Sequence, residues 1–154
     1  MQEDHVRRCN AARHVATAFA NTAALLYERD LKQMPPKRPR HVVPFVVNAS
    51  FAVELFLKAL SHRHGVSLRG HQLLKLYDRL PEDASLDIQS ASARVAAQTV
   101  PPQFQNTRQA LSELNNAFVE WRYVHEKQEL GPLNLGSVVL LVKVMHEACA
   151  TSAV

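Results

Sequence analysis

The chain has 154 residues, which suits one domain with a continuous hydrophobic core. Apolar residues make up 47% and charged residues 21%, a balance that argues against intrinsic disorder. The formal net charge of +4 permits an acidic partner such as nucleic acid but does not require one. No segment approaches the roughly 20 apolar residues of a membrane span, and the polar first ten residues predict no secretory signal. We therefore expect a cytoplasmic protein that does not enter a membrane.

Clustered prolines divide the chain into segments in which apolar residues recur at helical spacing. The first predicted helix covers about residues 3–33. Its predicted inner stripe consists of Val6, Cys9, Val15, Phe19, Ala23 and Leu26. A basic, proline-rich loop follows at 32–43, because its prolines prevent helix and its cations require water. The second helix begins near Pro44, a favoured first-turn residue, and ends near His64, before Gly65.

The second half of the chain predicts further helices. A short one covers about residues 72–80, and an Ala- and Ser-rich stretch at 81–102 predicts a weaker helix and a linker. A long helix follows at 103–129 and stops at Gly131-Pro132, and a last helix covers 134–150. Long helices with short connections predict a single all-α domain over residues 1–154, an antiparallel up-and-down bundle of four to five main helices.

A narrow polar line runs along the second helix, which is otherwise apolar almost all round. It consists of Ser50, Glu54, Lys58 and Ser61, at positions i, i+4, i+8 and i+11. One interpretation is a thin solvated stripe, in which the Glu54–Lys58 pair contributes only ~0.3–0.5 kcal/mol. The other is that Glu54 faces a polar cleft and orients a partner cation. The sequence favours the solvated stripe.

The long helix carries two faces. Leu111, Leu114, Phe118 and Trp121 recur at heptad spacing and should face the core. Arg108, Asn115, Arg122 and Glu126 fall together on a different face.

Arg122 stands between Trp121 and Tyr123, so its guanidinium should lie at the edge of the core and require negative charge nearby. It forms either an ion-pair clamp with Glu126 or Glu54, or a phosphate grip that those glutamates hold in place. The sequence leaves both open.

His71 opens the short helix together with Gly70. Its side chain either caps that helix or lines a cleft, and a single histidine is more often structural.

Three stretches together resemble the HEPN domain family: NASFAVELFLKAL (Asn48 to Leu60), GHQLLKLYDRLP (Gly70 to Pro81) and NAFVEWRYVHE (Asn116 to Glu126). The resemblance covers most of the chain from Asn48 onward, and the first and last helices match by pattern only. It implies an antiparallel helical bundle that is usually a homodimer. Many members of the family are metal-independent endoribonucleases of defence or toxin systems.

The family's catalytic motif is an Arg followed, after four to six residues, by a His near the start of a late helix. There the Arg stabilises charge on the phosphorane and the His transfers a proton. Here Arg122 and His125 are separated by only two residues, although i, i+3 spacing still places them on one helical face. A formal match at Arg8 and His14 lies in the first helix, the wrong place, and we discount it. Relatives without the motif resemble non-catalytic binders of nucleotides or proteins.

The leading hypothesis is therefore a HEPN-like binding or regulatory module, associated with a nucleotide or RNA, in a defence or toxin–antitoxin system. Its expected binding residues are Arg122, Glu54, Lys58, His71, Tyr123, Glu126 and Asn115. One alternative is a metal-independent endoribonuclease with Arg122 and His125 as catalytic residues. Another is a helical bundle that neutralises a partner protein. We expect neither a cofactor nor a metal site, and we expect Cys9 and Cys149 to be free thiols.

Overall fold

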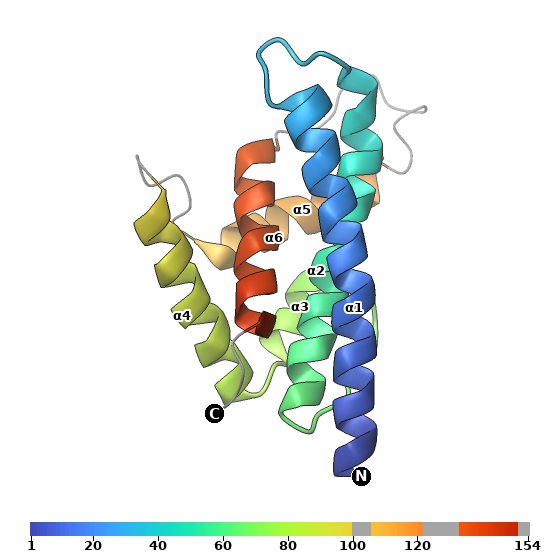
Figure 1. The fold of residues 1–154 in the computed structure, drawn as a ribbon, viewed down its shortest axis with the longest axis vertical. Coiled ribbons are helices and arrows are strands. Elements are labelled where there is room, and N and C mark those ends of the chain that lie inside the picture. The colour runs from blue at the N-terminus through green and yellow to red at the C-terminus, as the bar shows by residue number, and fades with distance from the viewer. Residues whose placement is uncertain (100–105, 122–132, 151–154) are drawn as a thin grey trace.

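The computed structural model describes residues 1–99, 106–121 and 133–150. Every regular element in this part of the chain is helical, which confirms the all-α prediction. The elements are α1 (Gln2–Leu26), the π-helical turn η1 (Tyr27–Leu31), the 3-10 turn η2 (Pro39–His41), α2 (Val42–Arg63), α3 (Leu73–Asp78), α4 (Glu82–Gln98), α5 (Thr107–Trp121) and α6 (Leu135–Ala150). α1, α2, α4 and α6 alternate in direction, and α5 lies across them behind α6 (Figure 1).

α1 packs along α2 through small side chains. The buried residues of α1 are Cys9, Ala16, Ala20 and Ala23, spaced by seven, four and three positions. Of the predicted inner stripe, Val6 and Val15 are wrong, since they are 55% and 45% exposed. The alanines face inward instead because they allow the two helix backbones to lie close together, which a β-branched side chain would prevent.

α2 is the central helix and contacts each of α1, α3, α4, α5 and α6. Its fully buried side chains include Phe45, Phe56, Leu57 and Leu60. It ends at Arg63, and Gly65 follows with a φ of +77°, a conformation that only glycine adopts readily.

The same helix corrects the expectation that no segment is long enough to span a membrane. Together with η2 it forms a 25-residue stretch, Pro39–Arg63, that meets the requirement by length and composition. In this fold 56% of its most apolar window is buried inside the protein. A core helix covered by other helices passes the same test, so the apolar composition of α2 is accounted for by its neighbours.

The remaining helices close the core around α2. The Ala- and Ser-rich stretch, for which the sequence predicted a weaker helix and a linker, forms a continuous helix of 17 residues, α4, which packs on α6. Its buried residues are Ala84, Ile88, Ala91 and Val95. In α5, Leu111 and Leu114 are fully buried, as predicted, while Phe118 is half-buried with its ring against that of Phe51. Residues 122–129 of the predicted long helix and the side chain of Trp121 lie outside the described part of the chain.

Candidate functional site

The polar line of α2 is buried, so the interpretation of a solvated stripe is wrong. Ser50, Glu54 and Ser61 are 3%, 7% and 0% exposed. Ser61 Oγ donates a hydrogen bond to the carbonyl of Val66 at 2.7 Å and so holds the turn after α2. Ser50 Oγ has no hydrogen-bond partner among the residues that the structure describes. Three polar side chains thus enter the protein along one face of its most apolar helix.

Glu54 is the centre of a cluster that joins α2 to the loop before α3. Its Oε1 accepts a hydrogen bond from Lys58 Nζ at 2.7 Å, one turn further along α2. The same oxygen lies 2.9 Å from His71 Nδ1. The side chains of Glu54 and Lys58 are 10% and 19% exposed, so this ion pair is largely desolvated and should be stronger than an exposed one. We call Glu54, Lys58 and His71 the Glu54 cluster.

His71 connects this buried carboxylate to solvent. Its side chain is 81% exposed although Nδ1 contacts Glu54. A carboxylate that accepts from Nδ1–H fixes the orientation of the ring and leaves Nε2 on the other edge for a ligand. The preceding residue, Gly70, has a φ of +107°, a backbone conformation that is unfavourable for residues with a side chain. This turn of the backbone at Gly70 places His71 beside Glu54. This histidine neither caps α3 nor points away from the bundle.

Asn115 has a structural explanation. Its Oδ1 accepts a hydrogen bond from the backbone N–H of Leu73 at 2.9 Å, across 42 positions of sequence. That N–H belongs to the first turn of α3, where no intrahelical acceptor exists and Gln72 supplies no side-chain cap. At the other end of α3, Arg108 forms an ion pair with Asp78. Asn115 and Arg108, on the polar face of α5, thus contact the first and the last turn of α3.

Of the predicted site residues, the structure therefore brings together Glu54, Lys58 and His71, and places Asn115 on the adjoining α5–α3 contact. The four others, Arg122, Tyr123, His125 and Glu126, lie outside the described residues.

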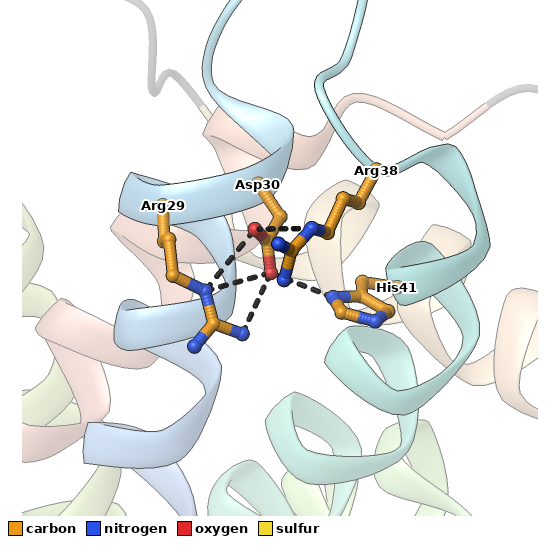
Figure 2. A network of polar contacts seen from close by, with 4 residues as sticks. All are labelled: Arg29, Asp30, Arg38 and His41. Atoms are coloured by element: carbon orange, nitrogen blue, oxygen red, sulfur yellow. Dashed lines mark hydrogen bonds and ion pairs between the residues drawn. The ribbon is translucent and has the colours of Figure 1, made fainter.

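A second buried carboxylate was missed by the sequence analysis (Figure 2). Asp30, in η1, is 1% exposed and lies among the side chains of Arg29, Arg38 and His41. Arg29 donates to both carboxylate oxygens at 2.8–3.1 Å, His41 Nδ1 lies 2.6 Å from Oδ2, and Arg38 Nε is 3.9 Å from Oδ1. The hydrogen bonds from Arg29, aided by His41 and opposed by desolvation, hold the pKa of Asp30 well below its usual range.

This Asp30 cluster ties the end of α1 to the basic loop and to η2. One signal for it was present in the sequence. Asp30 lies four positions after Leu26 and seven after Ala23, so it continues the inner stripe, and a carboxylate there requires a cation.

A third polar cluster joins the ends of three helices. Arg63, at the end of α2, donates to the carbonyls of Ala148 and Cys149 in the last turn of α6. It also lies 3.6 Å from Asp87 of α4, which is 2.9 Å from His64 Nε2. A cation beside the last carbonyls of a helix is favoured by the helix dipole, so this cluster is structural.

The histidines at 62 and 64 diverge. Their i, i+2 spacing sends His64 to Asp87 and His62 to His5, whose Nδ1 lies 3.2 Å from that of His62. Burial, followed by the neighbouring His5, lowers the pKa of His62. Within the described ranges, no three His, Cys, Asp or Glu side chains lie close enough together to hold a metal ion.

Comparison of the chain with protein-family models, with curated proteins and with solved structures finds no match. The functional argument therefore depends on the residues themselves.

Proposed function

We propose that the chain is a HEPN-like helical module that binds a nucleotide or an RNA phosphate at the Glu54 cluster. Its expected form is a homodimer, and its expected setting is a defence or toxin–antitoxin system. The observation that carries the proposal is the exposed imidazole of His71, held by a buried carboxylate beside a nearly buried lysine.

The arrangement of the helices supports this proposal. The stretches that resemble the family lie in α2, around α3 and in α5 with the residues that follow it. Those three helices contact one another pairwise, and the Glu54 cluster lies where α2 meets the segment leading into α3. Arg122 directly follows the last residue of α5 in sequence.

The chemistry of the cluster suits an anion that carries hydroxyl groups. Lys58 supplies a positive charge that can serve both Glu54 and a phosphate, and desolvation strengthens such interactions. His71 Nε2 can donate to a phosphate oxygen or accept from a ribose hydroxyl. Glu54 keeps the ring in place, so that little side-chain entropy is lost when a ligand binds.

The direct test is binding of fluorescent single-stranded RNA and of ATP to the full chain, measured by anisotropy and calorimetry. His71→Ala should weaken binding about tenfold, the loss expected for one charge-assisted hydrogen bond. Arg122→Ala should weaken it without a large loss of stability. The matched control is His5→Ala, which removes a half-buried histidine near the start of α1 and should leave binding unchanged. Absence of binding by the wild-type chain, or equal affinity of the His71 and His5 variants, would overturn the proposal.

An endoribonuclease is the second candidate, because a carboxylate-oriented histidine is also the arrangement of a general acid or base. The purified chain should then cleave single-stranded RNA in the presence of a chelator. Loss of cleavage in His125→Ala with a folded protein would support the family's chemistry at Arg122 and His125. Loss in His71→Ala instead would assign proton transfer to the Glu54 cluster. Uncleaved RNA with the wild-type chain removes this candidate and leaves the binding proposal intact.

A further inference from the structure

Two adjoining cavities open between α1 and α6, away from the Glu54 cluster. The first, of about 260 Å³, is walled by alanines of α1, by Phe45 of α2 and by Val139 and Val142 of α6. The second, of about 560 Å³, is walled by polar residues nearer the start of α1, including Arg13 and His14. His146 of α6 contributes to both walls, so the two cavities adjoin there, and we call them together the α1–α6 groove.

The groove changes from apolar to basic along its length. His146 follows Val139 and Val142 along α6 and lines both cavities, so it marks where the apolar cavity meets the polar one. Arg13 and His14 extend the basic part along α1. The described walls contain no carboxylate, so an anion placed there would meet no like charge.

The contacts of three neighbouring side chains of α6 determine which charges face the α1–α6 groove. Glu147, the acid next to His146 in sequence, forms an ion pair with Arg94 of α4, and α4 lies on the opposite side of α6 from α1 (Figure 1). The His146 ring lies edge-on to Phe56, with centroids 5.8 Å apart, so its position in the wall is set by the core. Lys143 Nζ lies 3.2 Å from Gln98 Oε1 of α4, on the far side of α6 from α1, so the head group is assigned to Arg13, His14 and His146 and not to Lys143.

We propose that the α1–α6 groove binds a small amphipathic anion, a carboxylate or phosphate on a short alkyl or aromatic body. The body occupies the cavity beside Phe45, and the head group lies among Arg13, His14 and His146. The polar cavity, of about 560 Å³, has the size that small-molecule sites have, typically ~300–1,000 Å³, and the apolar cavity, of about 260 Å³, is slightly smaller. Burial of the body supplies affinity and the basic end supplies orientation. This site is separate from the Glu54 cluster and does not depend on the proposed function.

Four probes separate the contributions of body and head: octanoate, octyl phosphate, octanol and inorganic phosphate, each titrated into the full chain by calorimetry. Octanoate or octyl phosphate should bind at least about tenfold more tightly than octanol or phosphate, and their ratio identifies the preferred head. Backbone amide NMR shifts should fall on residues 13–24 and 139–146. Equal binding of octanol and octanoate, or shifts elsewhere on the molecule, would overturn the proposal.

Two variants and one control locate the site. Ala24 is exposed and lines the apolar cavity, so Ala24→Phe should fill it and abolish octanoate binding while the fold is retained. Arg13→Gln should weaken binding of the anions and leave that of octanol unchanged. Arg40→Gln removes an exposed arginine of η2 and controls for the loss of overall charge. An unchanged affinity in folded Ala24→Phe, or equal weakening by Arg40→Gln and Arg13→Gln, would contradict the assignment.

Discussion

At the scale of single residues, the molecule uses similar ion pairs in two different environments. Asp4 pairs with Arg7 and Arg8 at the surface, where its side chain is 44% exposed. Asp30 receives hydrogen bonds from Arg29 in the same way, but its side chain is 1% exposed. Water and salt screen the first set of charges more than the second, whose carboxylate is buried, so of the two it is Asp30 that should make folding depend on its ionisation.

Asp30→Asn tests this difference. The pKa of Asp30 in the folded chain lies below the value near 4 of an unfolded chain, so ionised Asp30 stabilises the fold above about pH 4. That stabilisation is lost as the pH falls from about 4 toward the lowered pKa. The variant should therefore have a lower free energy of unfolding at pH 7, and its stability should fall less than that of the wild type below pH 4. Urea unfolding at pH 7 and pH 3 measures both.

The matched control is Asp4→Asn, which should change the free energy of unfolding little at either pH. A loss as large as that in Asp30→Asn would mean that burial does not distinguish the two carboxylates. An acid sensitivity of Asp30→Asn equal to that of the wild type would assign the effect to another group.

The same scale shows which side-chain contacts a sequence can reveal. The Glu54–Lys58 pair could be predicted because i, i+4 spacing places both side chains on one turn of helix. The contact of His71 with Glu54 could not, because it depends on the backbone conformation at Gly70 and on how the segment before α3 returns to α2. Asp30 and His41 meet only because the basic loop folds back over the end of α1.

At the scale of elements, the bounds of the helices were easier to predict from the sequence than the side of each helix that is buried. Expected bounds of 44–64 and 134–150 compare with Val42–Arg63 and Leu135–Ala150, because proline and glycine act locally on the backbone. The inward face of α1 was predicted in part: Cys9 and Ala23 are buried and Phe19 and Leu26 pack against the core, whereas Val6 and Val15 are exposed. Alanine is compatible with burial and with exposure, so a stripe of alanines carries little periodic signal against neighbouring valines.

Neighbouring substitutions in α1 test which face is buried. Ala16 is 0% exposed against α2, so Ala16→Leu forces extra methyl groups into a tight contact and should cost about 1–3 kcal/mol in the free energy of unfolding. Val15 is 45% exposed, so Val15→Leu should stay within about 0.5 kcal/mol of the wild type. Chemical denaturation of the two variants compares them directly. A larger loss for Val15→Leu would restore the originally predicted stripe.

At the scale of the whole molecule, the arrangement of helices depends on contacts that join distant parts of the chain. Arg63 reaches the carbonyls of Ala148 and Cys149 across more than 80 positions, and no motif marks this contact in the sequence. The all-α class followed from periodicity, whereas the crossing of α5 behind α6 depends on side-chain packing between elements (Figure 1). For the candidate site, sequence spacing indicated the pair of Glu54 and Lys58, and the fold added the contact of His71 with Glu54.

The rate at which the Cys149 thiol is labelled measures how often α6 separates from α2. Its thiol is 1% exposed, its Sγ lies 3.5 Å from the carbonyl oxygen of Phe56, and burial raises its pKa to about 12. The reactive form is the thiolate, so at pH 8 the folded protein should label only when α6 opens. In a Cys9→Ala background, labelling by a disulfide reagent should be far slower in the native chain than in urea. Equal rates in the two conditions would contradict the burial of Cys149.

Arg63→Met should increase the native labelling rate of Cys149 about tenfold or more. The substitution removes two charge-assisted hydrogen bonds to α6, each worth about 1.5–3 kcal/mol, and about 1.4 kcal/mol in the free energy of opening corresponds to tenfold in rate. Arg69→Met, in the exposed loop between α2 and α3, controls for loss of charge and should leave the rate unchanged. If Arg63→Met leaves the labelling rate unchanged, apolar packing alone holds α6 against α2. Acceleration confined to that variant would show that one guanidinium at the end of α2 governs the opening of the last helix.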